Sequence, residues 1–108
     1  MKSISVASTI ATALAVILTL PVSAPAQNAS ETLYKGKCSA CHGADGTGTA
    51  MGKKLGALDF HSAEVRKMSD AALVDTITNG RDKMPAFGKS LKAEDIQGLV
   101  AFIRTLQK

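Results

Sequence analysis

Two cysteines and a histidine lie within five consecutive residues of this 108-residue chain, in the order Cys38-Ser39-Ala40-Cys41-His42. This C-x-x-C-H spacing is the attachment signature of a c-type haem. On a helical turn, residues i and i+3 are neighbours, so each thiol can form a thioether with one of two vinyl groups on adjacent pyrroles. The histidine that follows can then reach the iron. The motif therefore predicts covalent haem attachment at Cys38 and Cys41 and iron ligation by His42.

Three other uses of the same residues are open: a structural disulfide, a redox-active cysteine pair and a zinc site. A redox pair of the thioredoxin type would follow a β-strand, and no strand pattern precedes Cys38. A zinc site needs four ligands, and the only histidine beyond the motif is the distant His61. Haem would also supply the apolar centre that a short chain with few aromatic residues lacks. The haem interpretation is therefore favoured.

The second axial ligand decides between electron transfer and ligand chemistry. Three methionines follow the motif: Met51, Met68 and Met84. Met84 precedes Pro85, which favours an extended backbone and stiffens the segment. Met51 stands in a glycine-rich loop and Met68 stands before a helix cap, so packing is the expected role of both. The residues alone favour Met84, with core packing of Met84 or ligation by His61 as open alternatives.

Three segments show helical periodicity. The first runs from Ser30 to Cys41, with Ser30 as its candidate N-cap. The second begins at Ser69-Asp70 and ends at Asn79-Gly80, where glycine permits a left-handed stop. The third, residues 94–108, has acidic residues at its start, basic residues toward its end, and an apolar stripe made of Ile96, Leu99, Val100, Ile103 and Leu106. No segment alternates with a period of two, so we expect an all-α fold of three or four helices with extended loops at 43–68 and 80–92.

Residues 1–26 have the features of a secretory signal peptide. Lys2 precedes an uncharged stretch that runs to Ala26, an apolar segment spans 10–20, and small residues at 24–26 suit a signal peptidase. An uncleaved membrane anchor is the alternative, although a spanning helix needs about 20 consecutive apolar residues. We therefore expect a cleaved signal peptide at 1–26 and a mature domain at 27–108, exported to the periplasm and not spanning the membrane.

Positive charge is in modest excess, with 13 Lys and Arg residues against 9 Asp and Glu and a formal net charge of +4. No basic run is interleaved with aromatic residues, which argues against nucleic-acid binding. Lys37 stands beside the motif, and Lys83 and Lys89 flank the Met84 segment. These lysines are candidates for steering an acidic-surfaced redox partner to the haem edge, and ordinary solvated lysines are the alternative.

Four features match a known pattern: Tyr34 four residues before Cys38, the run CSACHGADGTG, the run MPAFG around Met84, and the final segment EDIQGLVAFIRTL. Together they resemble the class I cytochrome c family, most closely its small, short-loop bacterial and photosynthetic members. The resemblance covers nearly all of the expected mature domain. It implies a class I cytochrome c-like fold with loops wrapped around one covalent haem, bonded to Cys38 and Cys41, with His42 and Met84 as axial iron ligands.

The resemblance also implies that the first and last helices cross near the haem, with aromatic contacts at Tyr34 and Phe102. Two departures from the family pattern are evident. The family often has glycine at the position of Ser30, where the two helices approach closely, and we expect Gly98 on the last helix to restore the room. The family also commonly has a proline after the motif, near a carbonyl that accepts the N–H of the proximal histidine. This chain has none there, so the sequence assigns no acceptor to His42.

A haem iron held by histidine nitrogen and methionine sulfur keeps both ligands in both oxidation states, and the thioether favours the ferrous form. The expected function is therefore a periplasmic one-electron carrier, a monomer that shuttles electrons between redox proteins and is not an enzyme. Two alternatives are kept: a haem subunit of a larger dehydrogenase or reductase complex, and a gas-binding or peroxidatic haem protein with a labile sixth ligand.

Overall fold

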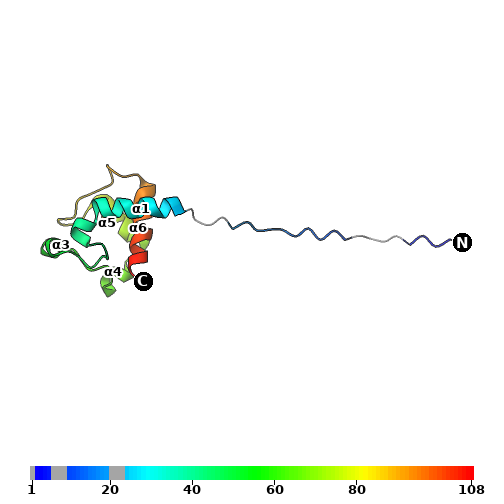
Figure 1. The fold of residues 1–108 in the computed structure, drawn as a ribbon, viewed down its shortest axis with the longest axis horizontal. Helices are drawn as coiled ribbons and strands as arrows, with labels where there is room; N and C mark the ends of the chain where they lie inside the picture. The colour runs from blue at the N-terminus through cyan, green and yellow to red at the C-terminus, as the bar shows by residue number, and fades with distance from the viewer. Residues whose placement is uncertain (1, 6–9, 20–23) are drawn as a thin grey trace.

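The computed structural model describes residues 2–5, 10–19 and 24–108, and this part of the chain contains helices but no β-strand. The helices are α1 (Ala24–Lys37), α2 (Ser39–His42), α3 (Ala50–Lys54), α4 (Ala63–Lys67), α5 (Asp70–Asn79) and α6 (Ala93–Leu106). Figure 1 shows them gathered into one body, from which residues 2–5 and 10–19 lead away as an extended trace. The signal-peptide prediction covers 1–26, of which 1, 6–9 and 20–23 lie outside the described residues. No described helix has the length and apolar character needed to cross a bilayer.

α1 extends further toward the N-terminus than the sequence suggested. Ser30 lies inside the helix, and its hydroxyl donates a hydrogen bond to the carbonyl of Ala26 at 3.1 Å. The assignment of Ser30 as the N-cap is therefore wrong. The helix can begin this early because Pro25 stands in its first turn, where a proline is tolerated, and because residues 26–29 include no glycine. A turn at Cys38 separates α1 from α2, so the predicted helix at 30–41 is two helices.

Two five-residue helices interrupt the segment 43–68, which was expected to be an extended loop. The hydroxyl of Thr49 caps α3 by accepting the N–H of Gly52 at 3.0 Å. The hydroxyl of Ser62 caps α4 in the same way. Each helix is shorter than two turns, so neither can display the 3.6-residue period by which the longer helices were identified. The expectation of three or four helices is thus an undercount, since six are present in the described residues.

The two helices expected in the C-terminal half are confirmed. α5 follows Ser69, whose hydroxyl accepts the N–H of Ala72 at 3.1 Å, and it ends at Gly80, where φ is +74°. Such a backbone conformation favours glycine because it has no Cβ. α6 begins after a capping interaction in which the carboxylate of Asp95 accepts a backbone N–H three residues earlier at 3.1 Å. These caps stabilise the helix ends by about 1 kcal/mol each.

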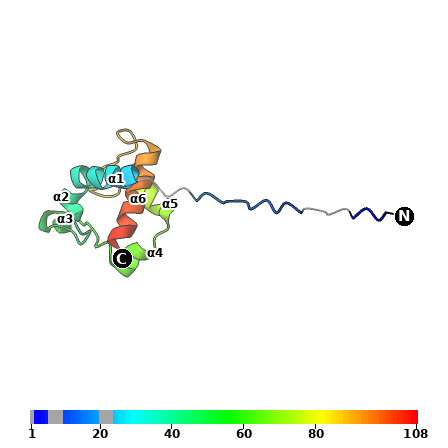
Figure 2. The ribbon, with the colours of Figure 1, turned by 45° about the vertical axis from the view of Figure 1, so that its right-hand side comes forward.

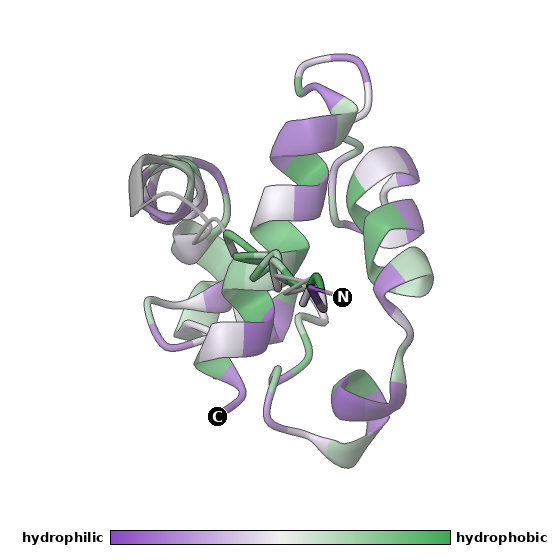
Figure 3. Ribbon diagram, turned by 90° about the vertical axis from the view of Figure 1, so that its right-hand side faces the viewer, coloured by the Kyte–Doolittle hydropathy of each residue, from purple (hydrophilic) through white to green (hydrophobic). Residues whose placement is uncertain are grey.

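α6 runs through the middle of the body and crosses α1, as Figure 2 shows. Its apolar stripe faces the core, since Ile96, Leu99, Val100 and Ile103 are buried. Figure 3 shows hydrophobic residues on the helices at the centre of the body. The ring centroids of Tyr34 and Phe102 lie 5.0 Å apart, which confirms the predicted aromatic contact between the first and last helices. A Cβ atom on Gly98 would lie 2.5 Å from the hydroxyl oxygen of Ser30, so Gly98 does provide the room that Ser30 requires. The core is formed by Tyr34, Phe60, Val65, Leu73, Ile77, Ile96, Leu99, Val100 and Ile103.

α3 packs directly on the backbone of α2 through a buried glycine. A Cβ atom on Gly52 would overlap the carbonyl oxygen of Cys41. The hydroxyl of Thr49 donates to the carbonyl of Ala40 at 2.8 Å, which holds the start of α3 against the same segment. Only a glycine allows this approach, so α3 acts as a backing for the Cys38–His42 motif.

We expect Gly52→Ala to lower the free energy of unfolding by at least about 2 kcal/mol, because the added methyl group overlaps a backbone atom that cannot rotate away. Gly36→Ala is the matched control, since no atom lies within 4 Å of the place its methyl group would take. Alanine at that helical position should be neutral or stabilising by up to about 1 kcal/mol. Urea unfolding of the two variants checks this, and equal midpoints would contradict the close packing of α3 on α2.

Candidate functional site

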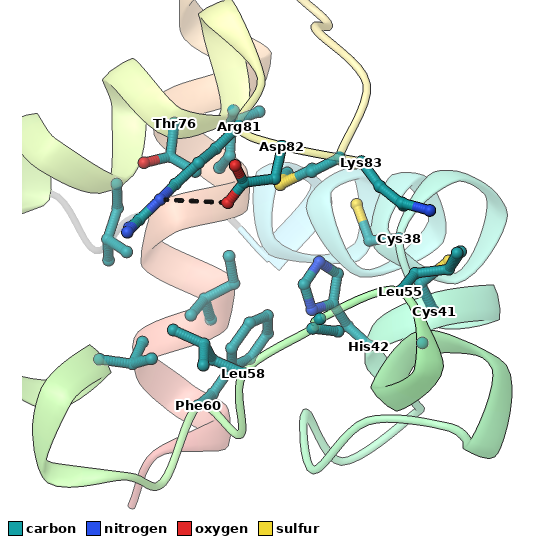
Figure 4. Close-up of a pocket in the computed structure, with 18 of the residues that line it drawn as sticks. Cys38, Cys41, His42, Leu55, Leu58, Phe60, Thr76, Arg81, Asp82 and Lys83 are labelled. Atoms are coloured by element: carbon teal, nitrogen blue, oxygen red, sulfur yellow. Dashed lines mark ion pairs between the residues drawn. The ribbon is translucent and has the colours of Figure 1, made fainter.

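The four predicted site residues, Cys38, Cys41, His42 and Met84, all line one cavity of about 330 Å³. Figure 4 shows Cys38, Cys41 and His42 on the side formed by the motif, and Leu58 and Phe60 on another. The Cys38–His42 motif and Met84, which are far apart in the chain, therefore meet at one site. Most of the remaining wall is apolar, and its residues include Tyr34, Leu55, Leu73, Ile77 and Ile103.

Hydrogen bonds from three neighbouring segments fix the motif. The N–H of Cys38 donates to the carbonyl of Tyr34 at 2.9 Å, and the N–H of His42 donates to the carbonyl of Cys38 at 2.9 Å. The hydroxyl of Tyr34 donates to the carbonyl of Gly43 at 2.7 Å. The N–H of Thr49 donates to the carbonyl of Cys41 at 2.9 Å. The motif is therefore held from α1, from the residue that follows it, and from the start of α3.

Met84 is presented by a tight turn that follows α5. The N–H of Met84 donates to the carbonyl of Arg81 at 2.8 Å, and the N–H of Arg81 donates back at 3.2 Å, forming an isolated β-bridge. Asp82, between them, has φ of +51°, a conformation that aspartate tolerates better than most residues. After Met84 the chain returns to α5, where the N–H of Phe87 donates to the carbonyl of Ile77 at 2.9 Å. The loop is thus anchored on both sides of Met84.

The other candidates for the sixth position differ in where they lie. Met68 is partly buried and also lines the cavity, which sequence reasoning did not anticipate. Met51 is 53% exposed on α3 and does not line it. His61 is turned toward other partners, with Nδ1 2.9 Å from the Asp59 carboxylate and Nε2 2.7 Å from the carbonyl oxygen of Leu106. Of the two cavity methionines, only Met84 stands in a stiff loop of the kind expected to present a ligand.

The protonation states of the motif follow from its burial. Burial lowers the pKa of the His42 imidazole, which keeps the ring in the neutral form that binds metals. Burial raises the pKa of the Cys38 thiol to about 11, whereas a redox-active cysteine has a lowered pKa. Cys38 and Cys41 form no disulfide with each other, and the described residues form no cluster of three His, Cys, Asp or Glu side chains suited to a metal ion. The disulfide, redox-pair and zinc alternatives therefore find no support.

The cavity fits the haem that the motif predicts. Its apolar wall suits a large flat macrocycle, and it receives two thiols and an imidazole from one segment and a thioether from another. The buried Nδ1 atom of His42 has no hydrogen-bond partner among the described residues. Sequence reasoning missed Phe60, whose ring stacks on the His42 imidazole with centroids 4.8 Å apart and an interplanar angle of 30°. A single phenylalanine in a presumed loop gives no periodic signal that would have identified it.

Comparison with known proteins agrees with this description. Residues 25–103 match the profile of the family described as cytochrome c oxidase, cbb3-type, subunit III. Cytochrome c6 of Rippkaea orientalis is 33% identical over 89 residues, which cover 82% of this chain and 78% of that protein. The cbb3-type cytochrome c oxidase subunit CcoP of Azospirillum brasilense is 37% identical over 86 residues, which cover 77% of this chain and 29% of that protein.

A solved structure shows the same fold. The KustC0563 c-type cytochrome aligns with a TM-score of 0.69 and 36% sequence identity, covering 73% of this chain and 98% of that one. The predicted fold class and the resemblance to small c-type cytochromes are confirmed by these matches. Covalent haem c with its iron is accordingly the cofactor of such a domain. The chain belongs to the c-type cytochromes, the family of small haem proteins that transfer electrons.

Proposed function

We propose that residues 27–108 form a periplasmic one-electron carrier whose haem is bonded to Cys38 and Cys41 and held axially by His42 and Met84. The observation that carries this proposal is the meeting of all four side chains at one cavity. The carrier acts as a monomer and passes electrons between redox proteins outside the cytoplasmic membrane. Similarity to cytochrome c6 over most of both chains supports a small electron carrier.

Each ligating side chain has a defined task in this proposal. The thiols of Cys38 and Cys41 would hold the haem through one thioether each to its two vinyl groups, an addition that consumes no oxidant or reductant. His42 offers a nitrogen lone pair because burial keeps its imidazole neutral. When bound, haem supplies one iron that changes between the ferric and ferrous states. Met84 offers a sulfur lone pair from a loop anchored on both sides, so little rearranges as an electron arrives or leaves.

The signal peptide is part of the proposal. Within the described residues of 1–26, Ile10, Leu14 and Ile17 are 86%, 85% and 84% exposed. An apolar segment exposed to water is unfavourable in a soluble mature protein, whereas it suits a leader that engages the export machinery and is then removed. Cleavage after Ala26 would leave in the mature protein both Ser30, which faces Gly98, and Tyr34, which contacts Phe102.

Intact mass tests the attachment and the cleavage together. Produced in cells that export proteins and attach haem, the protein should have the mass of residues 27–108 plus one haem, and the haem should stay bound on denaturation because thioethers survive it. The Cys38→Ala/Cys41→Ala variant should release any haem when denatured. A colourless exported product with the bare peptide mass would refute the proposal.

Two methionine variants separate the possible sixth ligands. In the ferric wild type we expect a near-infrared band from sulfur-to-iron charge transfer. Met84→Leu should abolish it and lower the reduction potential by on the order of 0.1 V or more, because the thioether favours ferrous iron. Met68→Leu, which removes the other cavity thioether, should retain the band. If Met68→Leu loses the band and Met84→Leu keeps it, the ligand assignment is wrong.

Lysines at the mouth of the cavity support an acidic-surfaced partner. Lys37 and Lys83 are exposed and line the same cavity as Cys38, and Figure 4 labels Lys83 among the lining residues. Lys89 is exposed but does not line it, so the structure groups only two of the three candidate lysines. Positive charge at this mouth raises the local concentration of an anionic partner surface.

Small charged oxidants measure this field directly. Lys37→Gln and Lys83→Gln should each slow oxidation of the ferrous protein by hexacyanoferrate(III), an anion, by roughly twofold to fivefold at low ionic strength. The difference should disappear near 1 M salt, where the screening length is about 3 Å. Oxidation by a cationic tris(phenanthroline)cobalt(III) complex should become faster in the same variants. Lys89→Gln is the matched control, because Lys89 does not line the cavity. Equal changes of the oxidation rate in all three variants would contradict the steering proposal.

A second function has specific support. The match to subunit III of the cbb3-type oxidase, and to 29% of the length of CcoP, favours a domain that serves one fixed partner within a larger complex. The residues around the haem would then be the same, but electrons would pass within an assembly. Purification of the exported protein from its own cells distinguishes the two functions. A fixed subunit co-purifies with its partner in a constant stoichiometry, whereas a free carrier purifies alone.

A further inference from the structure

Phe60 occupies a special position beside the motif. Phe60 is 7% exposed, and its ring stacks on the His42 imidazole with centroids 4.8 Å apart and an interplanar angle of 30°. Among the described residues no other aromatic pair involves His42. Figure 4 shows both rings among the side chains that line the cavity. Phe60 therefore covers one face of the imidazole proposed to bind iron.

Three separate contacts hold Phe60 in this place. Its N–H donates to the carbonyl of Gly46, in the loop after the motif, at 2.9 Å. Its carbonyl accepts from the side-chain amide of Gln107, beyond the end of α6, at 2.8 Å, and Gln107 is 8% exposed. Its ring meets the edge of Tyr34 with centroids 6.4 Å apart. A Cβ atom on Gly46 would lie 2.5 Å from the Phe60 ring, so the loop packs closely against this side chain.

The contact between Phe60 and His42 matters because of Nδ1, the ring nitrogen of His42 that is not proposed to bind iron. A metal-binding histidine usually donates its other N–H to a carbonyl, a carboxylate or water, which fixes the rotation of the ring and raises its basicity. Here Nδ1 is buried and no acceptor among the described residues reaches it. Hydrogen bonding from the described chain therefore does not set the orientation of this imidazole.

We propose that Phe60 is the positioning residue of the proximal histidine: its ring takes the place of the hydrogen bond by stacking on the imidazole, and it keeps water away from Nδ1. This inference rests on the proposed axial role of His42. An imidazole whose N–H has no acceptor donates less electron density to iron, which favours the ferrous form. Phe60 thus raises the reduction potential without touching the iron, and Gln107 acts on the potential by anchoring Phe60.

The test compares two phenylalanine-to-leucine variants of the haem-loaded protein. Phe60→Leu removes the stacked ring and opens space in which water can accept the Nδ1 hydrogen. We expect a severalfold shift of the equilibrium toward the ferric form, where tenfold corresponds to 59 mV for one electron. The ferric electron paramagnetic resonance g values should also change, since they respond to the orientation of the axial imidazole. Phe60→Tyr, which retains a stacked ring, should restore both readouts toward those of the wild type.

Phe102→Leu is the matched control. It also removes an aromatic ring from the core, 5.0 Å from Tyr34, but it does not contact His42 or line the cavity. Its potential and g values should equal those of the wild type. If Phe60→Leu and Phe102→Leu give the same values, the inference is overturned, while the haem and the near-infrared band still support the proposed function.

Gln107→Ala keeps the test decisive should Phe60→Leu fail to accumulate. This variant keeps the Phe60 ring but removes the hydrogen bond from Gln107 to the Phe60 carbonyl. We therefore expect a smaller shift of the reduction potential, in the same direction as for Phe60→Leu. A wild-type potential and wild-type g values in Gln107→Ala would then overturn the inference. Failure of the proposed function itself has a different signature, namely a wild-type protein without covalent haem.

Discussion

The crossing of α1 and α6 is the contact on which the rest of the structure depends. Its most buried side chains, Tyr34 and Leu99, are 1% and 0% exposed, and Gly98 permits the close approach. α1 ends at the Cys38–His42 motif, so the angle between the two helices fixes where the motif lies relative to the core. Because a close-packed interior resists deformation, the crossing gives the motif a stable base.

The C-terminal end of α6 contacts the part of the chain that contains Phe60, His61 and Asp70. Next to this end, Gln107 binds the carbonyl of Phe60, the carbonyl of Leu106 meets His61 at 2.7 Å, and Arg104 pairs with Asp70 at 2.9 Å. These contacts join residues separated by 47, 45 and 34 positions along the chain. The exposed ion pair contributes little free energy by itself, but the buried amide contact fixes a segment that would otherwise be free to move. α6 thus ties the segment that carries Phe60 to the same core that positions His42.

The parts of the structure that could be predicted are those encoded locally. α6 shows a full 3.6-residue stripe, α5 has a serine cap and a glycine stop, and the Cys38–His42 motif carries its chemistry within five residues. α3 and α4 could not be predicted, because five residues show no period and α3 depends on the fit of Gly52 against Cys41. The stacking of Phe60 was likewise hidden, since it depends on contacts with residues far along the chain. Local patterns therefore predicted the candidate ligands, and long-range packing determined their surroundings.

The two sides of the cavity differ in how firmly they are held, and this difference bears on function. The motif is backed by α1, α3 and the core, whereas Met84 stands in a loop whose turn residues, Asp82 and Lys83, are exposed. Segments with few buried contacts open more readily than those packed in the core. If the proposed ligand set holds, detachment of the sixth ligand would begin in the Met84 loop, while the proposed attachment to Cys38 and Cys41 stays intact. Under the proposed function, gas binding at the sixth position would then depend on the stability of this loop, to which the hydrogen bond from Phe87 to the carbonyl of Ile77 contributes.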